Sequence, residues 1–426
     1  MADRRLIDDC FLTDSERLRH DEALAILRER VGPVVGPERI RLAEALGRVL
    51  AEPVTSPRDV PAADNAAVDG YAYASADYDA AGGYFPVVAR VAAGHPSSVP
   101  HIRGTAVRIF TGAIMPDGAD TIAMQEDCES HVQDAQGFVA IPPGLKPGAN
   151  RRKAGEDLAK DAIVAKPGTR LRPQELAAIA STGADGIAVY RRLRVAIVST
   201  GDEIVRPGTP LKEGQVYDSN HLLLAALLAS VDCAVTDAGI LPDDAEEVTK
   251  ALSALATTHD AVLTTGGASR GEEDHLITAL DTLGRRHLWQ LAVKPGRPMS
   301  FGQIGDCAMV ALPGNPVAAF VCFLMYVRPM LTVMGGGYWP EPQRFMVRAG
   351  FSIDKRKTGR REFLRGRLAA GGNGEPVVRK FPRDGSGLIT SLREADGLIE
   401  VSEDVQTVKE GEPVTFIPFS GLGLAP

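Results

Sequence analysis

The sequence predicts a multidomain α/β protein. Its central domain is expected to be a three-layer sandwich around a parallel sheet, with a β-rich inserted domain, a small helical linker domain and a C-terminal β-barrel. The chain has 426 residues, which is too long for one ordinary hydrophobic core. Between residues 194 and 330, apolar strand-like runs alternate with helical segments, as they do in parallel sheets. Short apolar runs between glycine and proline turns lie on both sides of this region.

The N-terminal third combines helical and extended segments. Residues 15–30 have helical periodicity, and residues 42–50 fit a second, short helix. Residues 52–61 are rich in proline and β-branched residues, which is typical of a linker. Residues 62–148 look β-rich, and the pattern predicts a helix over 173–182 with a proline near its start.

The central region alternates between the two periodicities. We expect buried strands at Arg194–Val198, Cys233–Ile240, Ala261–Thr265, Leu288–Val293 and Ala308–Leu312. We expect four helices in this region. The first spans 219–228 and is capped by Asp218, the second spans 245–255, the third follows the glycines at 266–267 and ends near 283, and the fourth spans 316–330. This order predicts helices on both faces of the sheet.

The C-terminal tail returns to short strands. Examples are Arg361–Leu364, Gly387–Thr390 and Pro413–Ile417. Short strands without intervening helices predict a small barrel or sandwich.

Composition excludes several classes of function. Lys and Arg total 47 against 55 Asp and Glu, so the chain has no global attraction for nucleic acid, and any bound anion must be held locally. We find no run of about 18 apolar residues and expect no membrane span. The charged start is unlike a secretory signal. The cysteines are dispersed without metal-ligand spacing, which indicates reduced cytosolic thiols and no structural zinc; they are Cys10, Cys128, Cys233, Cys307 and Cys322.

Polar loops follow three of the predicted strands. They are Thr200–Glu203, Gly266–Gly271 and Pro313–Pro316. Ligands of open α/β sheets bind beyond the carboxyl ends of the strands, glycines allow close backbone approach, and helix N-termini offer N–H groups to anions. One such loop is equally well a tight turn. Three at strand ends of one sheet favour a binding site, although the loops match neither a dinucleotide fingerprint nor a P-loop.

Charged side chains accompany these loops. Lys294 and Arg297 occupy a rigid turn that suits a phosphate or a similar anionic group, although a solvated basic turn explains them equally well. The carboxylates Asp202, Glu203, Asp243 and Asp274 could supply the one or two ligands that Mg²⁺ needs beside phosphates. Any one of them could instead be a helix cap or lie in an exposed turn.

Two upstream motifs are unusual. Asp64–Ala72 places two acids around apolar residues and continues into Gly-Tyr, and Arg151–Asp157 places three cations before two acids. Each alone reads as a surface turn. Both are far from the sheet in sequence, so a shared site would require packing between domains or subunits.

These motifs carry a family resemblance. Asp64–Ala72, DNAAVDGYA, resembles the DNSAMDGYA signature of molybdopterin molybdenumtransferases, the bacterial MoeA type that also forms the E domain of gephyrin. Further segments follow in the family's order and resemble its RI-TGA, NIR-x-x-GED, STGDE, YDSN, TTGGVSVG, KPGKP and LPGNPV motifs; they are residues 108–113, 150–157, 199–203, 217–220, 264–271, 294–298 and 312–317. The resemblance covers most of the chain.

The resemblance implies four domains and a homodimer. The boundaries expected are 1–54 with 149–190 for the linker domain, 55–148 for the inserted domain, 191–335 for the α/β domain and 336–426 for the barrel. It implies that molybdate is inserted into adenylylated molybdopterin with Mg²⁺, releasing AMP and molybdenum cofactor. The active site would lie between the sheet of one subunit and the DGYA-bearing domain of the other. The preceding adenylyltransferase and molybdoenzyme chaperones are the implied protein partners.

The resemblance also implies roles for individual residues. The catalytic positions it implies are Asp69, Thr111, Asp157, Glu203, Asp243 and Asp274, with Glu203 and Asp274 as metal ligands. The substrate-binding positions are Gly266, Gly267, Ser269, Gly271, Lys294, Arg297, Pro313, Asn315, Arg365 and Ser386. Acids near a bound oxyanion would repel it unless a metal or protons intervene, and the sequence leaves this conflict open.

Three positions depart from the family pattern. Arg270 stands where the family usually has Val, Ala318 replaces a frequent Ser, and Gln290 stands where some relatives have Lys. Two other functions remain in competition. A pterin adenylyltransferase would share the glycine loop but lack the DGYA and GED motifs, and a non-catalytic scaffold would need neither the acids nor the basic turn.

Overall fold

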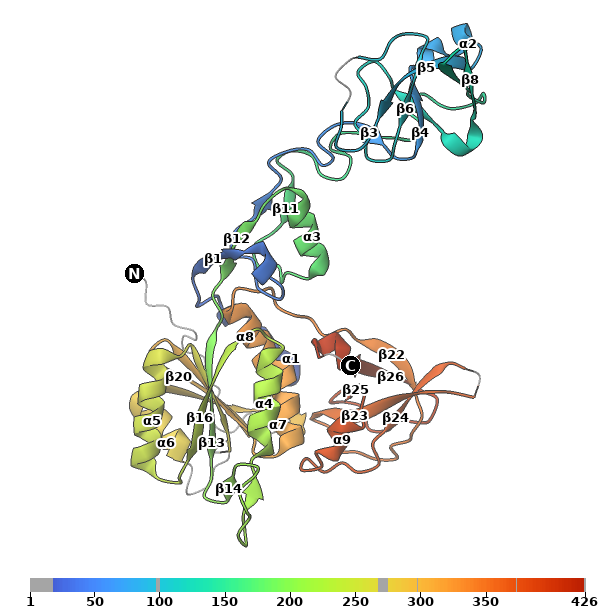
Figure 1. Cartoon of the computed structure of the whole chain (residues 1–426). Helices are drawn as coiled ribbons and strands as arrows, with labels where there is room; N and C mark the ends of the chain where they lie inside the picture. The colour runs from blue at the N-terminus through green and yellow to red at the C-terminus, as the bar shows by residue number, and fades with distance from the viewer. Residues whose placement is uncertain (1–17, 97–99, 267–274, 297, 373, 425–426) are drawn as a thin grey trace.

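The molecule is elongated. The computed structural model describes residues 18–96, 100–266, 275–296, 298–372 and 374–424. The inserted β domain lies at one end, a narrow linker domain follows, and the α/β domain and the C-terminal barrel lie side by side at the other end (Figure 1).

The α/β domain is built on one six-stranded sheet. Its strands, in spatial order, are β16 (Ala234–Leu241), β13 (Arg194–Thr200), β17 (Ala261–Thr265), β21 (Cys307–Leu312), β20 (Pro298–Ile304) and β18 (Arg285–Gln290). The first four are parallel, and β20 and β18 are antiparallel. The expectation of a parallel sheet holds for the first four strands only. A two-residue turn joins Ile304 to Cys307, too short for the crossover that a parallel strand requires.

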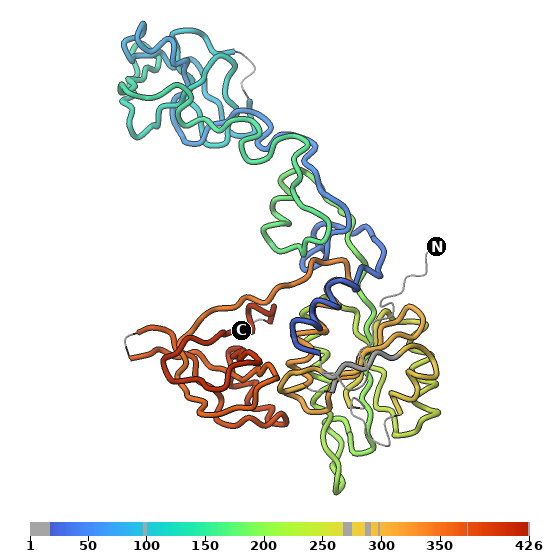
Figure 2. Tube along the Cα trace, turned by 180° about the vertical axis from the view of Figure 1, so that it is seen from behind, coloured from blue at the N-terminus to red at the C-terminus, as the bar shows by residue number. Residues whose placement is uncertain are grey.

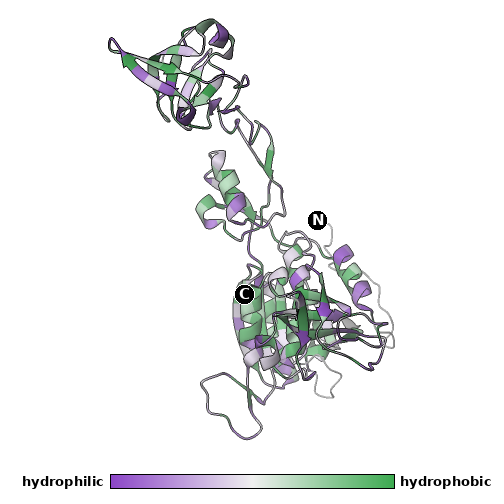
Figure 3. Cartoon of the chain, turned by 90° about the vertical axis from the view of Figure 1, so that its right-hand side faces the viewer, coloured by the Kyte–Doolittle hydropathy of each residue, from purple (hydrophilic) through white to green (hydrophobic). Residues whose placement is uncertain are grey.

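Helices cover both faces of this sheet, as predicted. One face carries α4 (Ser219–Ala229), α7 (Pro316–Cys322) and α8 (Arg328–Met334), and the other carries α5 (Ala245–Thr258) and α6 (His275–Leu283). Alternate residues of β13 enter the two cores: Val195 and Ile197 pack on the α4 side, Ala196 and Val198 on the α5 side. Hydrophobic residues are concentrated in these buried strands (Figure 3).

A π-helical turn, Phe323–Val327, joins α7 to α8. The resulting helix, Pro316–Met334, is long and apolar enough to cross a membrane by length and composition, although Arg328 interrupts its apolar run. Of the most apolar 18-residue window of this helix, 83 % is buried inside the protein, as is typical of the central helix of a folded core.

The C-terminal domain is a closed five-stranded barrel, as expected. Its strands are β23 (Arg361–Ala370), β24 (Pro376–Lys380), β22 (Phe345–Ala349), β26 (Pro413–Pro418) and β25 (Gly397–Val401), and β25 closes back on β23. A short strand, β19 (Val293–Lys294), pairs in parallel with the start of β23. The α/β domain and the barrel therefore share a backbone ladder.

Two strand predictions in these domains were wrong. The strand expected at 288–293 is divided between β18 and β19, because Val293–Lys294 pairs with the barrel. The strand expected at 387–390 is a turn that leads into α9 (Thr390–Arg393). The first segment owes its conformation to a strand distant in sequence, whereas the second is a turn held by local hydrogen bonds, such as that from the Ile389 N–H to the Gly387 carbonyl at 3.1 Å.

The linker domain is assembled from two separate parts of the chain. β1 (Pro37–Arg41) pairs with β12 (Gly186–Tyr190), β2 (Val54–Thr55) pairs with β11 (Ile163–Ala165), and α3 (Pro173–Ser181) packs on β11. The helix expected over 42–50 is only a 3₁₀ turn at Leu42–Glu44. Gly47 has a positive φ, and Val49 and Leu50 bridge to extended segments, which ends the helical path.

The inserted domain has its own six-stranded sheet. Its strands, in spatial order, are β7 (Thr121–Met124), β4 (Gly70–Tyr73), β6 (Ala106–Ile109), β5 (Tyr84–Val91), β9 (Gln136–Ala140) and β8 (Glu129–Gln133). At its junction with the linker domain, β3 (Asn65–Ala66) pairs with β10 (Arg151–Arg152).

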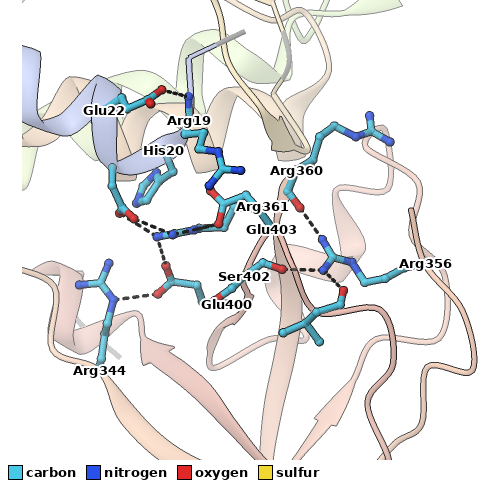
Figure 4. A network of polar contacts seen from close by, with 12 residues as sticks. Arg19, His20, Glu22, Arg344, Arg356, Arg360, Arg361, Glu400, Ser402 and Glu403 are labelled. Atoms are coloured by element: carbon cyan, nitrogen blue, oxygen red, sulfur yellow. Dashed lines mark hydrogen bonds and ion pairs between the residues drawn. The ribbon is translucent and has the colours of Figure 1, made fainter. Parts of the chain in front are cut away.

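Helix α1 (His20–Arg30) lies against both the α/β domain and the barrel (Figure 2). Its apolar side chains join the α/β core, and Arg361 of the barrel donates to both oxygens of Asp21, at 2.9 and 2.8 Å. The same guanidinium binds Glu400 and Glu403, each at 3.0 Å (Figure 4). This network fixes the barrel in its position beside the α/β domain.

Candidate active site

Four neighbouring strand ends form one edge of the α/β sheet. β16, β13, β17 and β21 are parallel, so the loops that follow them lie next to one another. The predicted loops are therefore brought together: Glu203 follows β13, Asp243 follows β16, Gly266 follows β17, and Pro313 and Asn315 follow β21.

Backbone glycines make the centre of this edge compact. A Cβ on Gly314 would lie 3.9 Å from the Cα of Gly266, and a Cβ on Gly266 would lie only 3.0 Å from the Thr200 hydroxyl. Asn220 of α4 donates to the Gly314 carbonyl at 2.7 Å. The Oδ1 atom of Asn220 is buried without a hydrogen-bond partner among the described residues. The centre thus exposes backbone and small polar groups rather than bulky side chains.

Carboxylates gather at one end of the edge. Asp202, Glu203 and Asp243 are exposed, and the N–H of Asp243 donates to Asp202 at 3.3 Å. Asp244 caps α5 through the N–H groups of Glu246 and Glu247. Asp243 and Glu203 are not engaged in capping, so their carboxylates are free to meet a cation.

Cations gather at the other end of the edge. Lys294, on β19, lies 3.5 Å from the buried carboxylate of Glu362 on β23. Lys294 was expected in a turn of the α/β domain, but the structure places it in the ladder shared with the barrel. The carboxylate of Asp384 also experiences the positive charge of Lys294. Burial alone would raise the pKa of Asp384, but its hydrogen bond to Lys380 and the charges of Lys380, Lys294 and Arg365 lower it.

Arg365 holds the turn that carries Ser386. Its guanidinium is buried and donates to the Ser391 hydroxyl and the Arg383 carbonyl, both at 3.0 Å. The Ser386 carbonyl accepts from the N–H of Val317 in the first turn of α7, at 3.0 Å. The barrel turn therefore contacts the loop that contains Asn315. Burial of the Arg365 guanidinium lowers its pKa.

The edge separates exposed charges of opposite sign. The exposed carboxylates Asp202, Glu203 and Asp243 follow β13 and β16, whereas Lys294 and the turn held by Arg365 lie beyond β21, where the barrel packs. Two further carboxylates, Glu362 and Asp384, lie among these cations and pair with Lys294 and Lys380. The glycine loops lie between the two ends.

A buried cluster that the sequence did not single out supports the Thr200–Glu203 loop. Asp218 accepts from the Ser199 hydroxyl at 2.5 Å, from Arg206 at 2.8 Å and from the N–H of His221 at 3.0 Å. Only its capping role could be predicted, because Ser199 and Arg206 approach it through the tertiary fold. Glu362 and Asp384 were missed for the same reason.

The DGYA motif forms a separate group in the inserted domain. The N–H and the hydroxyl of Thr111 both donate to Asp69 Oδ1 at 2.8 Å. These two hydrogen bonds, with a smaller contribution from Arg108, lower the pKa of Asp69. Asp69 is therefore a fixed, ionised carboxylate at neutral pH.

The GED motif lies beside the start of the DGYA motif. Asp64 accepts from the N–H of Ala154 at 2.8 Å and pairs with Arg151 at 3.2 Å. Asp157 is exposed, and its N–H donates to the Val60 carbonyl at 3.1 Å. These acids belong to the inserted domain and its junction with the linker, which lie far from the strand-end edge of the same chain (Figure 1).

Some predicted positions lie outside the described residues. They are Gly267, Ser269, Arg270, Gly271, Asp274 and Arg297. The departure at Gln290 falls on a described strand, β18, whose side chain is not described.

Comparison with known proteins identifies the family to which this architecture belongs. Three family models match the chain: the MoeA N-terminal region (domain I and II) over residues 18–183, the "Probable molybdopterin binding domain" over 196–333 and the MoeA C-terminal region (domain IV) over 347–419. The molybdopterin molybdenumtransferase of Haemophilus influenzae is 36% identical over 403 residues, which cover 94% of this chain and 98% of that relative. The chain belongs to the MoeA family.

Other MoeA family members agree over the same length. Molybdopterin molybdenumtransferase 2 of Mycobacterium tuberculosis is 33% identical, over 92% of this chain and 96% of the relative. The crystal structure of the molybdopterin biosynthesis MoeA protein from Pyrococcus horikoshii OT3 superposes with a TM-score of 0.79 at 28% identity, covering 95% of this chain and 100% of that chain. The match extends over all four units of the fold.

Proposed function

We propose that this chain is a molybdopterin molybdenumtransferase. It inserts molybdate into adenylylated molybdopterin in the cytoplasm and releases AMP and molybdenum cofactor. Water cleaves the phosphoanhydride bond, which leaves the pterin phosphate and AMP. The two dithiolene sulfurs bind molybdenum and displace one oxide of molybdate, which leaves with the thiol protons as water. Membership of the MoeA family and the names of its curated relatives support this activity.

The observation that carries the proposal is the division of charge along the strand-end edge. Lys294 and the supported turn around Arg365 and Ser386 offer cations and hydrogen-bond donors to molybdate. Gly266 and Gly314 allow the flat pterin and the phosphates to approach the backbone.

The acidic end of the edge fits Mg²⁺. Glu203, with Asp202 and Asp243 nearby, offers only oxygen ligands, and Asp274 would be a further ligand implied by the family resemblance. A Mg²⁺ ion at this end would need only one or two of these carboxylates besides substrate phosphates and water. The bound ion would supply Lewis-acid polarisation of the pyrophosphate.

A homodimer would complete the site. In one chain, Asp69 and Thr111 are carried by the domain farthest from the sheet (Figure 1). A partner subunit would bring its own DGYA motif to this strand-end edge. The ionised Asp69, held by two hydrogen bonds from Thr111, would then act as a fixed base or as an orienting group for the substrate. An adenylyltransferase would supply the substrate, and molybdoenzyme chaperones would receive the product.

The direct test is release of AMP from adenylylated molybdopterin. We expect release to require both molybdate and Mg²⁺, and we expect Asp69→Ala to abolish it while leaving the unfolding transition and the dimer unchanged. Accumulation of adenylylated pterin from ATP and molybdopterin would instead assign the preceding step. Normal AMP release by Asp69→Ala would remove the DGYA motif from the mechanism.

A further inference from the structure

A cavity lined by several arginines lies at the edge of the sheet opposite the candidate active site. Its volume is about 260 Å³. Arg191–Leu193 and Ser230–Asp232, which line it, directly precede β13 and β16, whereas the active-site loops follow these strands. Arg170 of the linker domain and residues 337–340, between α8 and the barrel, complete the wall. Three parts of the fold therefore meet at this cavity.

The cavity is strongly cationic. Four arginines line it, together with a single carboxylate, Asp232; they are Arg170, Arg191, Arg192 and Arg328. Asp232 is already paired with Arg192 at 2.8 Å and with Arg48 at 3.2 Å. Arg191 is likewise neutralised, by two 2.7 Å hydrogen bonds to Asp260. The charges of Arg170 and Arg328 are left without a carboxylate partner in the described structure.

Arg328 is the decisive residue. It begins α8 within the buried core helix, yet its guanidinium has neither a hydrogen bond nor an ion pair with any residue that the structure describes. Burial, and then the positive charge of Arg170, lower the pKa of Arg328 to about 10. A half-buried guanidinium beside a second cation is unfavourable unless an anion joins the pair.

Arg170 is already oriented toward the cavity wall. Its Nη1 donates to the Ser230 carbonyl at 2.7 Å, which leaves its other donors available. The remaining wall is partly apolar and includes Leu193, Val231 and Leu331. The volume lies below that of sites for drug-sized ligands, which is roughly 300–1,000 Å³, so the adenylylated pterin is too large for it.

We propose that this cavity is a second anion site, in which Arg170 and Arg328 bind a tetrahedral oxyanion of the phosphate class, free or as a small monoester. The guanidinium groups supply planar, charge-assisted donors that match such an anion. Arg170 belongs to the linker domain and Arg328 to the α/β domain. The bound anion therefore holds together the two domains at the junction beyond which the inserted domain carries the DGYA motif.

Calorimetric titration of the full-length protein with inorganic phosphate tests this site. We expect Arg328→Met to weaken phosphate binding at least about tenfold, because a charged, partly desolvated donor is lost. Arg172→Met is the matched control, since Arg172 is an exposed arginine of the same linker domain paired with Glu175. Arg172→Met should bind phosphate as the wild type does.

Two further variants and a second ligand distinguish this site from the active site. Lys294→Ala, at the catalytic edge, should retain the Arg328-dependent phosphate affinity, and Arg170→Gln should weaken it several-fold without the risk of disturbing a buried helix. AMP titrated in parallel distinguishes a phosphate monoester from the free ion. Equal phosphate affinity in the wild type, Arg328→Met and Arg170→Gln would overturn the proposal, whatever the outcome of the AMP-release assay. Loss of binding in Lys294→Ala alone would also overturn it.

Discussion

At the scale of single residues, one matched pair of opposite charges anchors the linker domain to the sheet. Asp260 directly precedes β17, and its carboxylate accepts two 2.7 Å hydrogen bonds from Arg191 and one of 2.8 Å from the N–H of Arg194. Burial alone would raise the pKa of Asp260, but these hydrogen bonds hold it below its ordinary value. Arg191 directly follows the linker strand β12, so this ion pair anchors the linker domain to the sheet.

The Asp260 pair predicts a pH-dependent loss of stability. A depressed carboxyl pKa contributes stability above the unfolded-state value of about 4, and this contribution is lost as the pH falls through the folded-state value. Asp260→Asn should therefore lower the free energy of unfolding by about 2 kcal/mol at pH 7. In urea titrations the difference from wild type should shrink below about pH 4.

The exposed Asp306 in the same domain provides the control. Asp306→Asn should change the free energy of unfolding by less than about 0.5 kcal/mol at either pH. A pH-independent deficit in Asp260→Asn would show that the carboxylate charge is not what stabilises the junction.

At the scale of elements, tight backbone approach positions the catalytic motifs. Gly70 directly follows Asp69 and lies on β4, between β7 and β6. A Cβ at this position would overlap the Ala123 carbonyl oxygen on β7 and lie 2.9 Å from its carbon. The glycine of the DGYA motif is therefore a packing requirement of the sheet that presents Asp69.

Gly70→Ala should destabilise the inserted domain by about 2 kcal/mol or more, because the strands must separate. Limited proteolysis should detect earlier cleavage within the inserted domain, and AMP release should fall with it. Gly36→Ala is the control, since a Cβ on Gly36 meets no atom within 4 Å. Equal protease resistance in the two variants would refute this explanation of the motif.

The elements predicted correctly are those whose signals are local. β13, β17 and β21 are continuous apolar runs that end in glycine-containing turns, and Asp218 caps α4 as expected. The strand predicted at 288–293 was wrong because its end pairs with the barrel, and the one predicted at 387–390 was wrong because local hydrogen bonds form a turn before α9. The strand-end rule brought Glu203, Gly266 and Asn315 together correctly.

The remaining site residues could not be found by that rule. Glu362 reaches Lys294 only because β19 pairs with β23, and Asp384 reaches the same cations through the turn held by Arg365. Neither contact follows from periodicity or from spacing along the chain.

At the scale of the whole molecule, the central claim is that two subunits build each active site. The narrow linker domain separates the DGYA motif from the strand-end edge of its own chain (Figure 1). The two halves of the proposed site also carry complementary features: the edge divides acids from cations, and the inserted domain presents one ionised carboxylate, Asp69.

Complementation between two inactive variants tests this claim most directly. Asp69→Ala and Glu203→Gln are co-expressed with different tags, and AMP release is measured on the mixed population and on each variant alone. A mixed dimer with shared sites has one site that carries both substitutions and one that carries neither. Random pairing therefore predicts recovery of about a quarter of wild-type activity. No recovery, in mixed dimers verified by both tags, would contradict an active site shared between subunits.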